Sequence, residues 1–321
     1  MWRPGLDSPM SAVDAATTTR EPLFTDEVLA RLRRVILHSR RLSKSGLSGE
    51  HRSRRKGPSP EFADFKAYTV GEDFRRIDWN AYARLENLYV RESEITTEFD
   101  VHILVDVSRS MEWSSTPEQD TKLRRALQLT GALGYLALWH FDRLSITPIG
   151  SDAQRRFGPV QGRTNVRPML AWLEHIRARQ ETDLVSAMSR LVFERRRPGM
   201  LLVISDFLSE DLERLEQAMR GAVSRGWDIA LIQIFDPAEA DPGRLEALRV
   251  TSQAVDIESR KRMPIRGDGP ALAAYRERRD AWLEDIRRLG SGARTLHLPI
   301  STEQGVDQSL VELLRSVGLV S

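Results

Sequence analysis

From about residue 100 onward, short apolar runs alternate with segments in which apolar residues recur at helical spacing. The runs 101–105, 200–205 and 229–235 are almost continuously apolar, a pattern typical of strands buried on both faces of a parallel sheet. Alternation of this kind predicts an α/β fold with a doubly wound, mostly parallel sheet. The expected strands are 88–95, 101–106, 144–149, 153–158, 200–205, 229–235 and 295–298, and the expected helices are 26–43, 122–140, 166–177, 184–195, 211–225, 271–289 and 306–317.

Two segments depart from this alternation. The strands 144–149 and 153–158 flank a turn at 150–152, which predicts a hairpin that carries an antiparallel edge of the sheet. The segment 237–270 breaks the rhythm, because 250–258 alternates only weakly and is followed by basic and glycine residues. We therefore expect an inserted hairpin near the last strands.

Polar side chains follow two of the buried strands. Asp106, Ser108 and Ser110 stand at the end of the first, Asp206 ends the second, and Thr182 begins a helical stretch. Because ligands bind just past the carboxyl ends of parallel strands, this arrangement outlines an ion site. Serine, threonine and aspartate also cap helices, so capping is the alternative interpretation of each residue taken alone.

The order Asp-x-Ser-x-Ser, then Thr, then a strand-terminal Asp resembles the metal-ion-dependent adhesion site of von Willebrand factor A domains, over roughly residues 99–300. The resemblance implies that Ser108, Ser110 and Thr182 bind Mg²⁺, or Mn²⁺, while Asp106 and Asp206 orient ligands and waters. Neutral hydroxyl ligands suit a small hard cation and leave it electrophilic, so a partner's carboxylate can replace one water. We expect the serine hydroxyls to be exposed at the strand tip and Asp106 to be buried.

A second resemblance precedes this domain. Residues 59–98 contain the stretches 61–65, 68–84 and 88–92, which together resemble the signature of the bacterial domain-of-unknown-function family fifty-eight. Members of that family carry the signature directly ahead of a von Willebrand factor A-like fold, and their usual associate is a MoxR-type AAA+ ATPase. The resemblance implies an adaptor or co-chaperone in protein assembly or remodelling, not an enzyme.

The two resemblances divide the chain into a flexible tail at 1–22, a family-specific region at 23–98 and a von Willebrand factor A-like domain at 99–321. Within the signature, two interpretations stay open. Its aromatic and aliphatic residues can form a core, or its charged residues can form a contact surface. The candidate core residues are Phe65, Tyr68, Ile77 and Trp79, and the candidate contact residues are Glu72, Asp73, Arg75 and Arg76.

Composition indicates a cytoplasmic protein. The chain has 321 residues, a net charge of +2 and no cysteine, which excludes disulfides and thiolate metal sites. Its longest apolar stretch, 129–141, is shorter than the roughly 20 residues that cross a bilayer and predicts a core helix. The N-terminus has no apolar stretch of the kind that signal peptides contain.

The segment 31–56 carries arginine and lysine residues throughout and a single acid, Glu50. Such a segment can bind nucleic acid, an anionic membrane surface or an acidic protein face. It can equally be a solvated amphipathic helix followed by a flexible loop. No aromatic residues interleave with the basic ones, which weakens a role in base stacking.

Enzyme signatures are missing from the chain. It has no P-loop, no Gly-x-Gly-x-x-Gly, no His-x-x-x-His and no Gly-x-Ser-x-Gly. The remaining enzymatic alternative is a phosphoaspartyl hydrolase with Asp106 at the strand tip, but that class needs a carboxylate where this chain has Ser108. We expect His102 and His140 to be core histidines with satisfied hydrogen bonds.

Overall fold

The computed structural model describes residues 22–25, 27, 29–30, 62–68, 79, 81–82, 87–93, 100–116, 120–149, 156–178, 183–195, 197–208, 211–240, 252–255, 262–265 and 269–309. The predicted tail up to residue 21, the basic segment 31–56 and Thr182 lie outside these residues.

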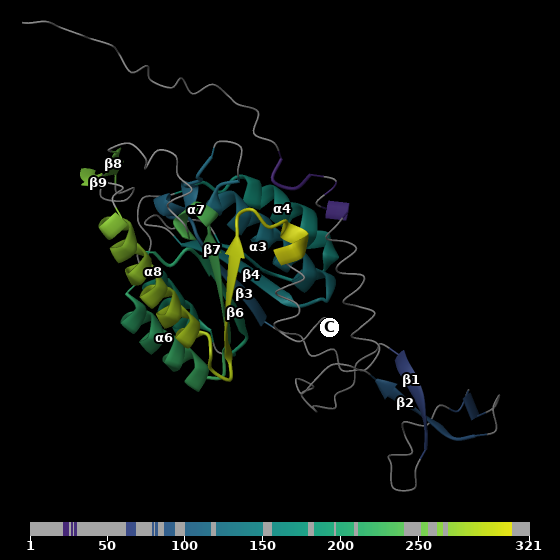
Figure 1. Ribbon diagram of the computed structural model, residues 1–321. Helices are drawn as coiled ribbons and strands as arrows, with labels where there is room; N and C mark the ends of the chain where they lie inside the picture. The colour runs from purple at the N-terminus through teal and green to yellow at the C-terminus, as the bar shows by residue number, and fades with distance from the viewer. Residues whose placement is uncertain are drawn as a thin grey trace, which may run out of the picture.

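Six strands form the central sheet (Figure 1), in the spatial order β10 (Thr295–Ser301), β7 (Asp228–Phe235), β6 (Met200–Ser205), β3 (Asp100–Asp106), β4 (Arg143–Ile149) and β5 (Phe157–Val160). Neighbouring strands are parallel except β5, which pairs antiparallel with β4 at one edge. From β3 the chain runs outward through β4 and β5, and it then continues from β6 outward on the other side. The predicted doubly wound, mostly parallel sheet is confirmed. Its order reverses between β3 and β6, where ligands bind in such sheets.

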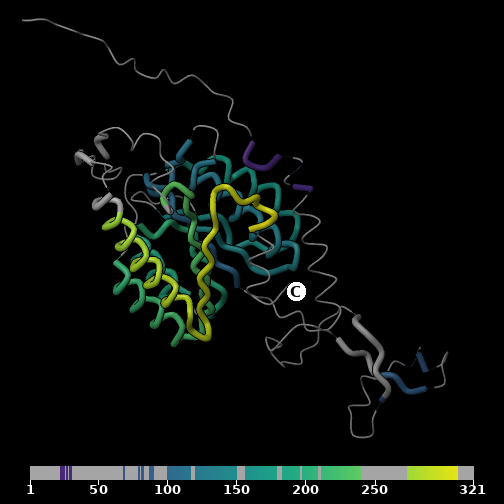
Figure 2. Tube along the Cα trace, viewed as in Figure 1, coloured from purple at the N-terminus to yellow at the C-terminus, as the bar shows by residue number. Residues whose placement is uncertain are grey.

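Helices cover both faces of the sheet. One core lies under α3 (Lys122–Trp139) and α4 (Val166–Glu174), and the other lies under α5 (Leu184–Glu194), α6 (Leu212–Ser224) and α8 (Gly269–Leu289). Figure 2 shows α6 and α8 side by side on the second face. Within β3, Ile103 and Val105 pack in the first core and Leu104 in the second, all fully buried. Burial on both faces explains why this strand is almost continuously apolar.

The late hairpin is also confirmed. A short helix, α7 (Pro237–Ala240), follows β7, and β8 (Ser252–Val255) pairs antiparallel with β9 (Arg262–Ile265) before α8 begins. The edge hairpin differs in detail from the prediction, because its second strand spans 157–160 and not 153–158. Val160 pairs with Leu144, so β5 continues past Pro159, where the apolar pattern weakens.

The N-terminal region contributes a separate strand pair and a contact with the main core. β1 (Phe62–Ala67), which the pattern did not predict, pairs antiparallel with β2 (Tyr89–Ser93). Phe24 packs on α3 above Gly131, where an added Cβ would lie 2.1 Å from the Phe24 ring. A glycine is needed at that helix position because the ring approaches the backbone so closely.

Two aromatic positions correct the sequence predictions. Trp79 is 61% exposed, and its ring is nearly perpendicular to that of Tyr82 with 6.2 Å between the ring centres, so its candidate core position is wrong. The two rings are three residues apart in a helical turn and contact each other. Phe141 lies beyond the end of α3 at Trp139 and is 51% exposed, so the predicted core helix ends before it. None of the described helices combines the length and apolar character needed to cross a membrane.

Candidate metal centre

Asp106 is held by two neighbouring strands at the end of β3. Its Oδ1 accepts a hydrogen bond from the Ser108 backbone N–H at 2.8 Å, and its Oδ2 accepts one from the Ser205 hydroxyl of β6 at 2.6 Å. The side chain is 2% exposed, as predicted. Burial, and next the charge of Asp206, raise the pKa of Asp106 above its ordinary value. The carboxylate is therefore fixed in place and lies beside a second acid.

The hydroxyls of Ser108 and Ser110 face each other at 2.9 Å. They are 0% and 8% exposed, so the predicted exposure of these hydroxyls is wrong. The physical reason is the 3₁₀ turn η2 (Arg109–Glu112), which folds the chain back over the strand end. Met111 in that turn is fully buried, and its N–H donates to the Ser108 carbonyl at 3.2 Å. The turn thus covers both serines while keeping their hydroxyls together.

Asp206 follows β6 in a tight turn. Its Oδ1 accepts from the Leu208 N–H at 3.1 Å, and the Phe207 N–H donates to the Ser205 hydroxyl at 2.9 Å. Phe207 has a φ of 58°, in the left-handed region that favours glycine, and its ring is fully buried. A backbone of this kind costs about 1–3 kcal/mol and persists only where packing and hydrogen bonds hold it. Here those contacts orient the Asp206 carboxylate.

Lys122 is a member of the site that the sequence did not reveal. Its ammonium lies 2.8 Å from Asp206 Oδ2 and 2.5 Å from Glu239 Oε1, and the side chain is 1% exposed. Burial alone would lower the pKa of Lys122, but Asp206 and Glu239 together raise it. The available signal was its place in the first turn of a helix, where the helix dipole disfavours a cation.

Hydrogen bonds extend the cluster to the segment after β7. Glu239 Oε2 accepts from the Asp236 N–H at 3.0 Å, and burial raises the pKa of Glu239 despite the nearby Lys122. Asp236 is fully buried, and its Oδ2 accepts from both the backbone and the hydroxyl of Ser115 at 3.0 Å each. The cluster therefore joins the loop after β3, the start of α3, the end of β6 and α7.

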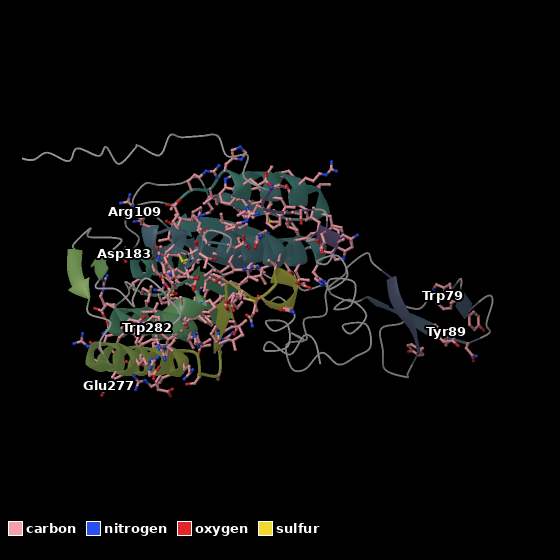
Figure 3. The ribbon with its side chains drawn as sticks, turned by 45° about the horizontal axis from the view of Figure 1, so that its top comes forward. Trp79, Tyr89, Arg109, Asp183, Glu277 and Trp282 are labelled. Carbon is pink, nitrogen blue, oxygen red and sulfur yellow. The ribbon has the colours of Figure 1, made fainter. Side chains whose placement is uncertain are left out.

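Thr182, the third predicted hydroxyl ligand, lies outside the described residues, but its neighbour is placed. Asp183 is the N-cap of α5, and its carboxylate accepts from the N–H and the hydroxyl of Ser186 at 2.9 and 2.6 Å. Figure 3 shows Asp183 on the side of the domain where Arg109 of η2 lies. The structure thus brings Asp106, Ser108, Ser110 and Asp206 together, and the contribution of Thr182 stays a prediction.

Helix capping does not account for Ser108 or Asp206. Thr121, Asp183 and Asp211 accept the capping hydrogen bonds of α3, α5 and α6. Ser108 stands at the N-cap position of η2, but its side chain makes no capping hydrogen bond. Asp206 lies five residues before the N-cap of α6, which is too far for it to cap that helix.

A family model described as "Protein of unknown function DUF58" matches residues 64–262. The chain belongs to the DUF58 family. Uncharacterized proteins of Mycobacterium tuberculosis and Mycobacterium bovis are 26% identical to it over 308 residues, which cover 88% of this chain and 95% of theirs.

Solved structures with related topology include an aerotolerance-related membrane protein from Bacteroides fragilis, with 13% identity and a TM-score of 0.44 over 68% of this chain and 98% of that one. The SpRpn10 VWA domain is 11% identical, with a TM-score of 0.40 over 67% and 95% of the two chains.

The DUF58 site has the donors and the charge to hold a divalent cation. Its described part contains an excess of carboxylates over one ammonium, which favours a cation: Asp106, Asp206, Asp236 and Glu239 against Lys122. Among the described side chains, no three His, Asp or Glu residues are grouped as metal ligands. The hydroxyl oxygens of Ser108 and Ser110 are further donors of the kind that Mg²⁺ accepts together with water.

The two histidines considered in the sequence lie away from this centre. His102 is 3% exposed beside Trp227, at 5.3 Å between ring centres, and neither ring nitrogen has a hydrogen-bond partner among the described residues. The prediction of a satisfied core histidine is therefore wrong there, because the cross-strand neighbour Ser145 accepts from Arg195 at 3.5 Å and makes no hydrogen bond to the ring. His140 is half-buried at the end of α3 and is not a core residue.

Proposed function

We propose that this chain is a Mg²⁺-dependent protein-interaction module that serves a MoxR-type AAA+ ATPase as an adaptor or co-chaperone in protein assembly or remodelling. One observation carries the proposal. Two buried hydroxyls, those of Ser108 and Ser110, face each other at 2.9 Å where the strand order reverses, beside Asp106 and Asp206.

In this proposal Ser108, Ser110 and Thr182 hold the cation, which would supply a Lewis-acidic position for a partner's oxygen. Asp106 fixes the loop, because it accepts from the Ser108 N–H and from Ser205 of the neighbouring strand. Asp206 is oriented by its own turn and lies close enough to influence Asp106. The chain's own groups thus position the ligands before any partner arrives.

The partner group best suited to such a centre is a carboxylate. Neutral hydroxyl ligands leave most of the charge of the cation uncompensated, and a partner Asp or Glu satisfies both that charge and the preference for hard oxygen. The MoxR-type ATPase is proposed as the partner from the family resemblance, with one of its acidic residues completing the coordination.

Calorimetric titration with Mg²⁺ and with Mn²⁺ tests the centre. The double variant Ser108→Ala/Ser110→Ala should lose binding, whereas Ser114→Ala should keep it. Ser114 is a matched control, because it lies in the same loop but its hydroxyl donates to the Thr116 carbonyl at 3.0 Å. Equal Mg²⁺ binding by the wild type and the double variant would show that the assignment is wrong.

Pull-down of the ATPase tests the partner. Binding should require divalent cation, tolerate moderate salt and disappear in Thr182→Ala. A contact led by the basic segment 31–56 would instead weaken steeply with salt, over a screening length of about 8–10 Å. Loss of binding only when Arg52, Arg54 and Arg55 are neutralised would favour that segment, and with it a nucleic-acid or anionic-membrane partner.

A further inference from the structure

Lys122 joins three elements that are far apart in the sequence. It is the first residue of α3, and its ammonium binds Asp206 after β6 at 2.8 Å and Glu239 of α7 at 2.5 Å. The exposed fractions are 1% for Lys122, 2% for Asp206 and 22% for Glu239. The ammonium is thus shut away from water between the candidate metal centre and α7.

Stability alone does not explain a lysine at this place. Burial of an ammonium costs several kcal/mol, and an ion pair of this kind can often be replaced by apolar side chains without loss of stability. The position is made worse by the positive end of the α3 dipole. A residue kept under such conditions points to a function that needs its charge.

We propose that Lys122 is a built-in counter-ion of the metal centre, which sets how tightly the centre holds a divalent cation and connects it to α7. The inference deepens the proposed function and rests on it. Both oxygens of Asp206 are engaged, Oδ2 by Lys122 and Oδ1 by the Leu208 N–H. Lys122 therefore competes with a bound cation for the negative charge of Asp206.

Glu239 affects this competition because it binds the same ammonium as Asp206. It holds the same ammonium and lies on α7, at the start of the inserted segment, and its carbonyl accepts from the Tyr275 hydroxyl of α8 at 3.2 Å. Without the charge of Glu239, the Lys122 ammonium forms an ion pair with Asp206 alone, and the cluster has one negative charge fewer. Cation binding then weakens, whereas removal of the Lys122 charge strengthens it.

Two variants of similar shape should thus shift the affinity in opposite directions. Calorimetric titration of the full chain with Mg²⁺ should show about tenfold tighter binding by Lys122→Met and about tenfold weaker binding by Glu239→Gln, the usual size of a coupling between neighbouring sites. The glutamine keeps an acceptor for the Asp236 N–H. Glu216→Gln is the control, because that exposed carboxylate pairs only with Arg220 on α6 among the ion pairs of the described residues, and it should leave the affinity unchanged.

Each outcome decides between the two proposals. If the wild type binds Mg²⁺ but both variants bind equally or both bind more weakly, Lys122 is purely structural and the metal centre stands. If neither the wild type nor Lys122→Met binds, both proposals fail. If Lys122→Met binds Mg²⁺ and the wild type does not, the counter-ion role of Lys122 is supported, and the proposal that the wild type binds Mg²⁺ is wrong. Should Lys122→Met not fold, Glu239→Gln decides alone: unchanged affinity overturns the inference, and weaker binding with the control unchanged supports it.

Discussion

Replacing His102 by leucine should stabilise the protein, although it alters a fully enclosed position in the central strand. The ring is 3% exposed, and neither nitrogen has a partner among the described residues. A buried polar group without a partner costs about 1–3 kcal/mol, and an apolar side chain of similar volume removes that cost. Leucine also keeps an apolar contact for Trp227, so we expect a gain of about 1–3 kcal/mol at pH 7.

The pH adds a second, separable effect. Burial, and then the charges of Arg195 and Arg156, lower the pKa of His102 from 6.5 to about 4. As the pH falls below 6.5, the unfolded chain takes up the proton before the folded one does, so stability is lost progressively until about pH 4. pH 5 lies about 1.5 units below the pKa of 6.5 of the unfolded histidine. At 1.36 kcal/mol per unit, the free energy of unfolding is therefore about 2 kcal/mol lower at pH 5. The leucine variant lacks this loss, so its advantage should be about 2 kcal/mol larger at pH 5 than at pH 7.

His297 provides a matched control in the same protein. Burial also lowers its pKa to about 4, but its Nε2 lies 3.0 Å from the Oε1 of Gln233, whose side chain is 2% exposed. His297→Leu leaves that buried oxygen without its donor and should cost about 1–3 kcal/mol at pH 7. The same substitution is thus expected to have opposite signs at the two positions.

Urea denaturation at pH 7 and pH 5 gives the free energy of unfolding of each variant. Equal destabilisation of both variants at pH 7 would refute the reasoning for His102, because it would mean that its ring nitrogens are satisfied in the folded protein. An advantage of His102→Leu that does not grow at pH 5 would refute the lowered pKa.

Substitutions at four further positions have definite expected results. Asp106→Ala should abolish Mg²⁺ binding in calorimetry. It should also lower the free energy of unfolding by about 2 kcal/mol or more, because it leaves two donors of the centre without their acceptor. Asp106→Asn should also lose Mg²⁺ binding, with a smaller decrease in the free energy of unfolding. Phe141→Gly should be about 1 kcal/mol more stable than Phe141→Ala in thermal denaturation, because both lack the ring and only glycine adopts a φ of 63° freely. Gly221→Ala should stabilise the protein by up to about 1 kcal/mol, because Gly221 is an exposed position of α6 with room for a Cβ. Gly199→Ala should destabilise the fold, since its Cβ would lie 2.1 Å from the Asp100 carbonyl oxygen.

The architecture was predictable because burial leaves a direct trace in the sequence. β3 and β6 are buried on both faces, so their apolar residues are nearly consecutive, and each run ends where polar residues begin. Those polar ends identified Asp106, Ser108, Ser110 and Asp206 as neighbours, because parallel strands end at the same edge. The inserted hairpin was found from the break in alternation.

The parts that the sequence did not predict depend on contacts between distant residues. Lys122 and Glu239 are 117 residues apart, and charged residues normally lie on the surface, so the sequence does not indicate that these two form a buried pair. The burial of Ser108 depends on how η2 folds over it, and the missing partners of His102 depend on the neighbours of its strand. Trp79 suggested a core through its apolar ring, but its contact is with another exposed ring.

Near the ends of β3 and β6, several residues occupy positions or backbone conformations that their residue types normally disfavour. Lys122 places a cation at the positive end of a helix, Phe207 has a left-handed backbone, and Asp106 is buried beside a second carboxylate. Each departure costs stability, and the helices nearby already have other residues as caps. Natural sequences retain such conflicts mainly at functional sites. The concentration of three conflicts around two facing hydroxyls therefore supports a binding centre at this edge of the sheet and argues against a purely structural turn.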